Sequence, residues 1–358
     1  MSPELKRIHH VEFLVGNAKQ AAYFYRKAFG FDQVAYRGPE TGYRKRASYV
    51  LRQGDIWLMF TTPLHHDDSL NIWLTLHGDG VRDIAFEVDD AAAIHDLSVD
   101  KGAVSDRPPR EFGDELGTVK MAKIQTYGEV VHTFIERRGY RGFLPGFRIQ
   151  EIKGEGVGLQ CIDHIVGNVE DHRMDSWVQW YDKVLGMDRF VSYDDKDIST
   201  EFTALRSTVV ATDDRRIKFP INEPAEGRRK SQIQEYIDHN VTAGVQHLAL
   251  KTDDILSTIA ALRRNGVEFL KVPDGYYEYA WEAVGAIRED RERVKELGIL
   301  VDRDDAGYLL QLFTRPLQDR PTFFVEIIQR AGSESFGKGN FRALFVTIEQ
   351  EQALRGNL

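Results

Sequence analysis

The sequence predicts an α+β fold made of two related halves, and three observations support this prediction. The chain has 358 residues, a length that suggests about two domains. A long internal repeat relates the first half to the second, and a glycine-rich stretch, 141–158, separates them. Within each half, runs of alternating apolar and polar residues follow stretches of helical periodicity. We therefore place a domain boundary near residue 155, with an N-terminal domain over 1–155 and a C-terminal domain over 156–358.

The composition argues against several classes of protein. Apolar residues make up 42% of the chain and charged residues 29%, which is ordinary for a folded protein. The net charge of −9 disfavours nucleic acid as a partner. The single cysteine, Cys161, cannot form an internal disulfide, and we find neither a signal peptide nor an apolar run of the roughly 20 residues that a membrane helix needs. We therefore expect a cytoplasmic protein that binds neither nucleic acid nor membrane.

Each half begins with a strand followed by a helix. The strand-like run at 8–11 (IHHV) is matched by the run at 162–165 (IDHI). A helical stretch follows, which ends FYRKAFGF at 24–31 in the first half and WYDKVLGM at 180–187 in the second. The matching order indicates that both halves open with the same unit.

A second unit begins in the middle of each half. The run GVRDIA at 80–85 is echoed by GVQHLA at 244–249, and both lead into an Asp-Asp pair that suits the start of a helix. Each half closes with an apolar strand stopped by glycine, HTFIERRG at 132–139 and FFVEIIQRAG at 323–332. The chain therefore contains four units, each made of a strand, a helix and several further strands.

A terminal helix is expected after the last strand. Beyond a flexible turn at 332–339, Phe341, Leu344, Phe345 and Ile348 fall at helical spacing. These side chains give the helix one apolar face. We expect that face to lie over another part of the protein.

The repeat singles out three residues of the second half as a candidate metal site. His164 lies in the first strand of the third unit, His247 occupies the equivalent place in the fourth, and Glu326 lies in the final strand of that unit. Related units packed about a pseudo-twofold axis bring such positions together. Two imidazoles and one carboxylate leave open positions on an octahedral metal, which suits Fe(II) and O₂. Their spacing contains no short-range motif, so the alternative is that both histidines are ordinary core residues.

The first half lacks this complete set. His10 matches His164, but Asp83 stands where His247 stands, and Glu326 corresponds to Thr133 or Glu136 depending on where the gap is placed. We therefore expect one Fe(II) per chain, in the second half, and a packing or assembly role for the first half. The remaining histidines are interpreted as structural or as part of a solvated loop: His9, His65, His66, His77, His95, His132, His172 and His239.

Long runs of the second half match a known pattern: LRSTVV (205–210), KFPINEP (218–224), KSQIQEYID (230–238), GVQHLAL (244–250), DRDDAGYLLQLFTRPLQDRPTFFVEIIQR (302–330) and FGKGNFRALF (336–345). They resemble the 4-hydroxyphenylpyruvate dioxygenase family, which the first half resembles more loosely through 11–31 and 130–147. The resemblance implies a vicinal-oxygen-chelate fold, in which each half is a pair of βαβββ modules curling into an open barrel. It also implies that His164, His247 and Glu326 hold Fe(II).

The family converts 4-hydroxyphenylpyruvate and O₂ to homogentisate and CO₂, a step of tyrosine and phenylalanine catabolism. Because this substrate contains its own 2-oxo acid, no separate oxo acid is needed. The resemblance implies that Phe313, Phe336 and Phe341 enclose the ring, the last two on a lid, and that Pro220 and Asn340 belong to the pocket. It implies a homodimer or homotetramer. The polar residues expected to position the substrate are Ser207, Asn222, Gln232, Gln246 and Gln311.

Three alternatives remain open. Hydroxymandelate synthase uses the same substrate, metal and ligands but hydroxylates the benzylic carbon, although Pro220, Asn222 and Phe313 favour the dioxygenase. A ligand-binding protein of the bleomycin-resistance kind has this fold but needs no metal ligands. A Zn(II) or Ni(II) isomerase would call for a fourth protein ligand, and none is evident in the sequence.

Overall fold

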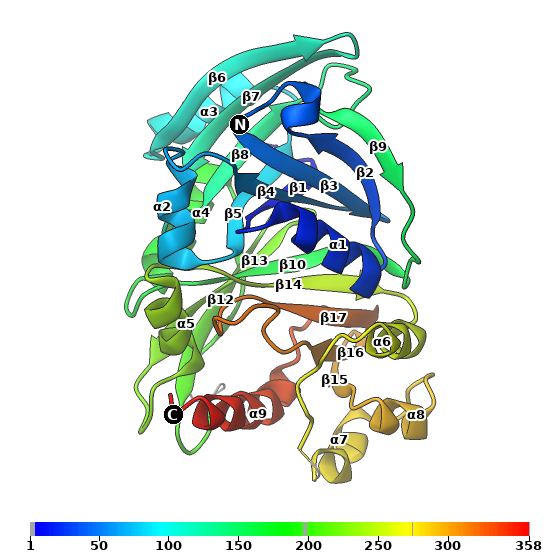
Figure 1. Ribbon diagram of the computed structural model, residues 1–358. Coiled ribbons are helices and arrows are strands. Elements are labelled where there is room, and N and C mark those ends of the chain that lie inside the picture. Colours follow the sequence, from blue (N-terminus) through cyan, green and yellow to red (C-terminus); the bar gives the residue numbers. More distant parts are fainter. Residues whose placement is uncertain (1–3, 196–198, 274, 358) are drawn as a thin grey trace.

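The computed structural model describes residues 4–195, 199–273 and 275–357. Its strands form two large sheets, one from each half of the chain, stacked one above the other in Figure 1. The first half contains β1 (Arg7–Leu14), α1 (Ala18–Ala28), β2 (Asp32–Arg37), η1 (Pro39–Thr41), β3 (Arg46–Gln53), β4 (Ile56–Pro63), α2 (Leu70–His77), β5 (Gly80–Glu87), α3 (Ala91–Asp100), β6 (Ser105–Asp114), β7 (Gly117–Gln125), β8 (Val131–Glu136) and β9 (Arg148–Ile152).

The second half follows a similar order, with two further helices within its second unit and, after its last strand, a terminal helix where the first half has β9. It contains β10 (Leu159–Asn168), α4 (Met174–Leu185), β11 (Asp188–Tyr193), β12 (Ala204–Ala211), β13 (Lys218–Ala225), α5 (Gln232–Asn240), β14 (Gly244–Thr252), α6 (Ile255–Arg264), α7 (Tyr276–Val284), α8 (Arg291–Glu296), β15 (Leu300–Asp304), β16 (Gly307–Phe313), β17 (Phe324–Ala331), η2 (Lys338–Asn340) and α9 (Phe341–Leu354).

The strand pairing confirms the α+β fold of four βαβββ units. The two sheets have the orders β6-β7-β8-β5-β1-β4-β3-β2-β9 and β11-β12-β13-β10-β14-β17-β16-β15. The opening strands of the two units pair antiparallel at the centre of each sheet, as β1 with β5 and β10 with β14. Each opening strand also pairs in parallel with the last strand of its own unit. A parallel pair needs a crossover connection, which the helices α1, α3, α4 and α6 provide.

The predicted helix starts at the two Asp-Asp pairs are confirmed. Asp90 accepts hydrogen bonds from the backbone N–H groups of Ala92 and Ala93, which begins α3. Asp254 accepts one from the backbone N–H of Ser257, which begins α6. An N-cap carboxylate stabilises a helix because it satisfies N–H groups that have no partner within the helix.

Four short helices have no counterpart in the predicted pattern: α2, α5, α7 and α8. Each has nine residues or fewer, a length over which apolar periodicity does not separate a helix from a strand. The helix α5 matters for function because it begins at Gln232, one of the predicted pocket residues.

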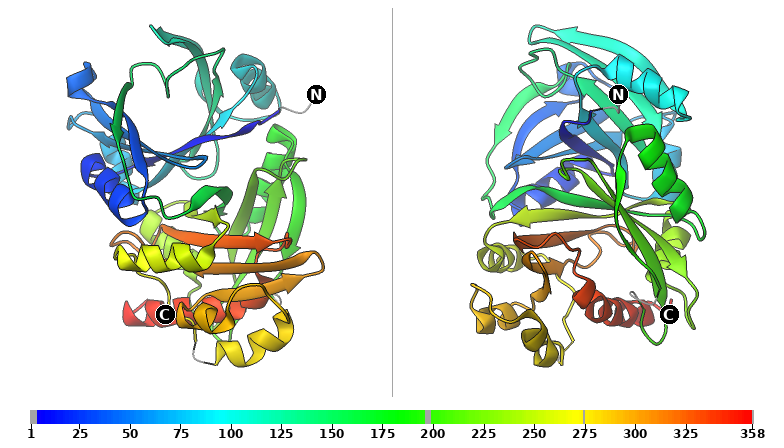
Figure 2. Two further views of the ribbon diagram at one scale, coloured as in Figure 1. Left: turned by 90° about the vertical axis from the view of Figure 1, so that its right-hand side faces the viewer. Right: turned by 180° about the vertical axis from the view of Figure 1, so that it is seen from behind.

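Each sheet curls around an interior of its own (Figure 2). The first interior is filled by apolar side chains of the segment after β8, chiefly Phe143, Leu144 and Phe147. The second is covered by α9, whose Phe345 belongs to a separate apolar cluster with Leu205 and Val209. The predicted terminal helix is therefore confirmed, and it covers the interior that holds the candidate site.

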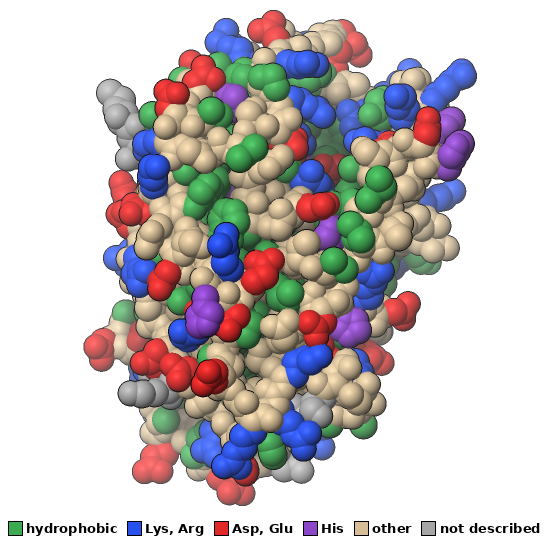
Figure 3. Space-filling model, turned by 90° about the vertical axis from the view of Figure 1, so that its left-hand side faces the viewer, with side chains coloured by type: hydrophobic (Ala, Val, Ile, Leu, Met, Phe, Trp, Pro, Cys, Tyr) green, Lys and Arg blue, Asp and Glu red, His purple; other side chains and the backbone are tan. Residues whose placement is uncertain are grey.

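Charged side chains of both signs are mixed on the outer surface. On the face shown in Figure 3, acidic and basic side chains lie next to one another over much of the surface. None of the described helices is long and apolar enough to cross a membrane.

Two buried histidines of the first half predict a loss of stability in acid. Burial lowers the pKa of His10 and of His132 to about 4. Because an unfolded histidine keeps its ordinary pKa of about 6.5, the unfolded state binds more protons between these two values. The free energy of unfolding should therefore fall as the pH drops from about 6.5 to 4, by up to about 1.4 kcal/mol per pH unit for each histidine. Urea unfolding at a series of pH values measures this. His132→Gln should have a shallower pH dependence than the natural protein, and an equal slope would contradict the assignment.

Candidate functional site

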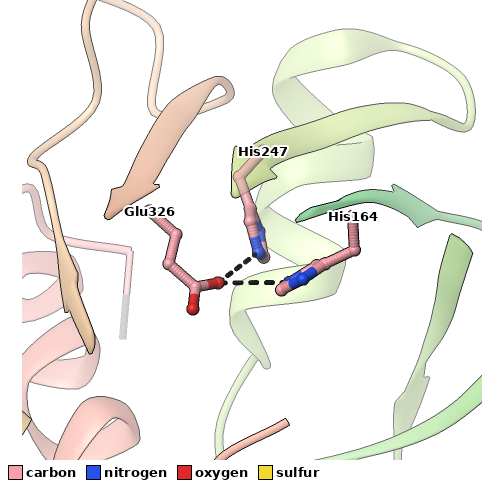
Figure 4. Close-up of side chains that lie close together, drawn as sticks. All are labelled: His164, His247 and Glu326. Carbon is pink, nitrogen blue, oxygen red and sulfur yellow. Dashed lines mark ion pairs between the residues drawn. The ribbon is translucent and has the colours of Figure 1, made fainter. Parts of the chain in front are cut away.

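Three side chains that are far apart in the sequence meet inside the second sheet (Figure 4). Nε2 of His164 lies 3.2 Å from Oε2 of Glu326, and Nε2 of His247 lies 3.3 Å from the same oxygen. All three side chains are buried. Among the residues that the structure describes, they form the one group of three or more potential ligands whose atoms all lie within 4.8 Å of one another.

Strand register explains why these residues meet. Ala249 on β14 pairs with His164 on β10 and also with Glu326 on β17, so these two side chains flank β14. His247 lies two positions before Ala249 and therefore on the same face of that central strand. The juxtaposition of equivalent strands that the repeat predicted is what brings the three together.

Each histidine follows a bulged residue that holds its other ring nitrogen. On β10 the pairing with β14 skips Asp163, and on β14 it skips Gln246. Nδ1 of His164 lies 2.8 Å from Oδ1 of Asp163, and Nδ1 of His247 lies 3.0 Å from Oε1 of Gln246. A carboxylate or amide oxygen at this place accepts the Nδ1 hydrogen and so leaves Nε2 to contact Glu326 or to bind a metal ion. Both imidazoles therefore turn Nε2 toward Glu326.

The electrostatics of the site fit a divalent cation. Burial raises the pKa of Glu326, but without a metal the positive charge of the imidazoles, chiefly His164, and the hydrogen bonds from His164 and His247 outweigh burial and lower it to about 2. The carboxylate is thus ionised inside the protein, and its Oε1 is buried without any hydrogen-bond partner. A buried carboxylate oxygen without a partner is costly unless a cation binds it. The donor set of two imidazoles and one carboxylate suits non-haem Fe(II).

A cavity adjoins the three residues, and most of the predicted pocket residues line it. Its wall includes Phe313 on β16, Phe336 before η2 and Phe341 on α9. The neutral amide and hydroxyl side chains in the wall include Ser207 on β12, Asn222 on β13, Gln232 on α5 and Gln246 on β14. Pro220, two residues before Asn222, also lies in the wall. The cavity wall therefore combines apolar side chains of α9, of the turn before it and of several strands with neutral polar groups of β12, β13, α5 and β14.

Two of the predicted site residues lie outside the wall of this cavity. Gln311 on β16 is covered by the turn before α9, where a Cβ on Gly337 would come within 2.2 Å of its Nε2. Oδ1 of Asn340 accepts a hydrogen bond of 2.6 Å from the hydroxyl of Tyr276. Gln311 therefore packs against the turn before α9, and Asn340 ties this turn to α7.

The sequence interpretation missed several residues of the cavity wall. Leu205 and Val209 flank Ser207 on β12 at the two-residue spacing that places them on one face. Strand alternation around Ser207 would have identified both. The other missed residues are Val166, Tyr193, Phe324, Leu344 and Phe345.

The first half contains a different set of residues at the corresponding place. Ala85 pairs with Thr133 as Ala249 pairs with Glu326, so Thr133 and not Glu136 is the counterpart of Glu326. Asp83 takes the place of His247 and accepts hydrogen bonds from the Thr133 hydroxyl and from Nζ of Lys123, the latter at 2.7 Å. An ammonium group therefore neutralises the buried carboxylate in this half.

Lys123→Met should destabilise the protein without affecting the candidate metal site. The change leaves the carboxylate of Asp83, which is almost fully buried, without its cation. Breaking a buried pair in this way costs about 3 kcal/mol. Urea unfolding of the metal-free protein measures the loss, and Lys123→Met combined with Asp83→Asn should recover part of it. An unchanged unfolding midpoint in the single variant would show that the pair does not stabilise the fold.

The chain is similar to known proteins in both sequence and structure. The Glyoxalase/Bleomycin resistance protein/Dioxygenase superfamily matches residues 7–128 and 161–312. Three similar proteins are each named 4-hydroxyphenylpyruvate dioxygenase. The one from Tetrahymena thermophila is 48% identical over 98% of this chain and 91% of its own length. Those from Caenorhabditis elegans and Dictyostelium discoideum are each 50% identical over 98% of this chain, covering 92% and 99% of their own lengths.

A solved structure has the same architecture. A mutant of 4-hydroxymandelate synthase from Streptomyces coelicolor superposes with a TM-score of 0.88 over 98% of this chain and 100% of its own. The two sequences are 31% identical. The identity to the synthase is thus well below the identity to the dioxygenases.

Proposed function

Because the chain belongs to the 4-hydroxyphenylpyruvate dioxygenase family within the Glyoxalase/Bleomycin resistance protein/Dioxygenase superfamily, we propose that it converts 4-hydroxyphenylpyruvate and O₂ to homogentisate and CO₂. The identity of about half of all residues over nearly the whole length of each relative supports this substrate. Hydroxymandelate synthesis remains the alternative on the same fold, and the lower identity to the synthase disfavours it.

We propose that His164, His247 and Glu326 hold one Fe(II) per chain. The observation that supports this proposal is the convergence of two Nε2 atoms on an ionised, buried carboxylate. A ferrous ion held there supplies an electron source for O₂ and a charge that binds the 2-oxo acid of the substrate. Asp163 and Gln246 contact Nδ1 of the two imidazoles, so Nε2 of each would be the atom that binds the ion.

The remaining residues of the cavity position the substrate and exclude water. Gln246 uses its amide oxygen on His247, so its NH₂ group remains as a donor toward the cavity. Ser207, Asn222 and Gln232 are neutral, which suits an uncharged phenol. Phe313, Phe336 and Phe341 surround the space with apolar rings and keep water from the reacting groups.

The test of the proposed reaction is identification of its product. Purified protein with ferrous iron, ascorbate and 4-hydroxyphenylpyruvate under air should give homogentisate and one CO₂ per O₂ consumed. 4-Hydroxymandelate as the product would contradict the assignment in favour of the synthase.

Removal of the metal should abolish this activity reversibly. Protein treated with a chelator and desalted should consume no O₂ with 4-hydroxyphenylpyruvate. Addition of one equivalent of ferrous iron per chain should restore most of the original rate of O₂ consumption. Restoration by Zn(II) instead would contradict an iron dioxygenase, because Zn(II) has no redox chemistry.

The organisation of the molecule is part of the proposal. We propose that residues 1–155 form a non-catalytic domain and residues 156–358 the catalytic domain with its lid helix, and that the protein is a cytoplasmic homodimer or homotetramer. The filled interior of the first half supports a packing or assembly role for it. Light scattering of the purified protein tests the assembly, and a monomeric mass would contradict it.

A further inference from the structure

Asp163 links a candidate metal ligand to a buried arginine. Its Oδ1 lies 2.8 Å from Nδ1 of His164. Nε and Nη2 of Arg330 donate to the two carboxylate oxygens of Asp163 at 2.8 and 2.9 Å. The paired side chains are 4% and 12% exposed, so solvent screens this ion pair little. The fork of two parallel hydrogen bonds fixes the plane of the carboxylate and therefore the direction from which it meets His164.

Arg330 also holds the turn that leads into the lid helix. Its Nη1 donates to the carbonyl oxygens of Ser333 and Ser335 at 3.1 and 2.6 Å. Its guanidinium carbon lies 5.5 Å from the ring centroid of Phe336, and that ring lies 5.0 Å from the ring of His164. Arg330 thus contacts both Asp163, which holds Nδ1 of His164, and the turn that places the ring of Phe336 against the ring of His164.

The first half provides an internal comparison, because it has the same turn without the metal ligands. Arg137 donates to the carbonyl oxygens of Tyr140 and Gly142, three and five residues further on, as Arg330 does to Ser333 and Ser335. Phe143, six residues after Arg137, lies with its ring 5.1 Å from that of His10, as Phe336 lies on His164.

The difference between the halves lies in the bulged residue. In the first half, His9 takes the place of Asp163, and its Nδ1 lies 2.9 Å from Nδ1 of His10. Nε of Arg137 is buried with no hydrogen-bond partner, whereas the equivalent Nε of Arg330 binds Asp163. Both halves therefore have a turn held by an arginine, Arg137 in the first half and Arg330 in the second. A carboxylate lies between that arginine and the histidine in the second half, where the three candidate metal ligands are complete.

We propose that Asp163 is a positioning residue for the metal ligand His164, and that Arg330 couples the position of the lid turn 333–336 to it. Movement of the turn displaces Arg330, Arg330 shifts the carboxylate, and the carboxylate reorients the imidazole. This inference rests on the proposed metal site. His247 differs in this respect, because the neutral amide of Gln246 holds its Nδ1.

Co(II) binding to the metal-free protein, followed by the visible absorption of the ion and by competition with a chelator, tests this proposal without turnover. Asp163→Asn places an NH₂ group opposite a donor of Arg330 or opposite Nδ1 of His164, so the Co(II) affinity should fall about 10–100-fold. Arg330→Gln should also weaken Co(II) binding about 10-fold or more. Arg137→Gln is the matched control: it disturbs the same turn in the first half and should leave the Co(II) affinity unchanged.

The outcomes separate this inference from the proposed metal site. If the natural protein binds no Co(II), or if His247→Ala binds it equally well, the metal site itself is wrong. If the natural protein binds Co(II) and folded Asp163→Asn binds it with the same affinity and spectrum, the positioning role is wrong. Equal effects of Arg330→Gln and Arg137→Gln would show that the arginine stabilises only its turn. Asp163→Asn is nearly isosteric and by itself decides the positioning role if Arg330→Gln does not fold.

Discussion

Glu326→Gln should abolish turnover of 4-hydroxyphenylpyruvate while the protein stays folded. The change removes the negative charge on which Nε2 of His164 and of His247 converge. Loss of a residue that only hydrogen-bonds to a metal ligand typically lowers metal affinity about 10–100-fold. Because Glu326 is itself a proposed ligand, we expect the affinity for Fe(II) to fall by more than this. Because glutamine has nearly the same shape, the free energy of unfolding of the metal-free protein should change by less than about 2 kcal/mol. Oxygen uptake, bound iron and urea unfolding measure the three quantities.

The first half provides the matched control for this variant. Thr133 is the counterpart of Glu326 by strand register, and Thr133→Val removes one hydrogen bond to Asp83. That variant should lose about 1 kcal/mol of stability and keep its iron and its oxygen uptake. Full turnover by Glu326→Gln, or equal loss of activity in both variants, would contradict the assignment of the metal site to the second half.

Removal of residues 336–358 should uncouple oxygen consumption from product formation or stop it. The segment supplies Phe336, Phe341, Leu344 and Phe345 to the wall of the cavity, and without them the candidate metal site opens to water. We expect the yield of homogentisate per O₂ to fall at least about 10-fold, since an open site neither holds the ring nor protects reactive intermediates. Parallel measurement of oxygen uptake and product gives this ratio.

Two further variants make the truncation interpretable. Removal of 356–358 alone leaves the cavity wall and the bidentate contact of Arg355 with Glu235 in place, so its ratio should equal that of the full chain. Phe345→Ala opens the wall but keeps the helix anchored by the hydrogen bond from Thr347 to the backbone of Lys271, and its ratio should fall in the same direction by less. Unchanged coupling after removal of 336–358 would show that the segment is not a lid.

Much of this architecture follows from sequence because the duplication is visible in the residues. The paired openings at 8–11 and 162–165, and the capping residues Asp90 and Asp254, mark the units in the sequence itself. Short helices such as α5 and α7 were not predicted, since nine residues carry too little periodicity to separate a helix from a strand. The contact of Gln311 with the turn at Gly337 was also beyond the sequence, because that turn comes from another part of the chain.

The sequence by itself determined which three residues could share a metal ion, because repeated units place equivalent strand positions around one pseudo-twofold axis. Tertiary structure decided between Thr133 and Glu136, since only the hydrogen-bonded register fixes which residue of β8 faces Ala85. It also decided that Asp163 turns back onto His164, because neighbours on a regular strand point to opposite faces and a bulge is needed to bring them together. Pairing between strands is a long-range property, and local sequence does not specify it.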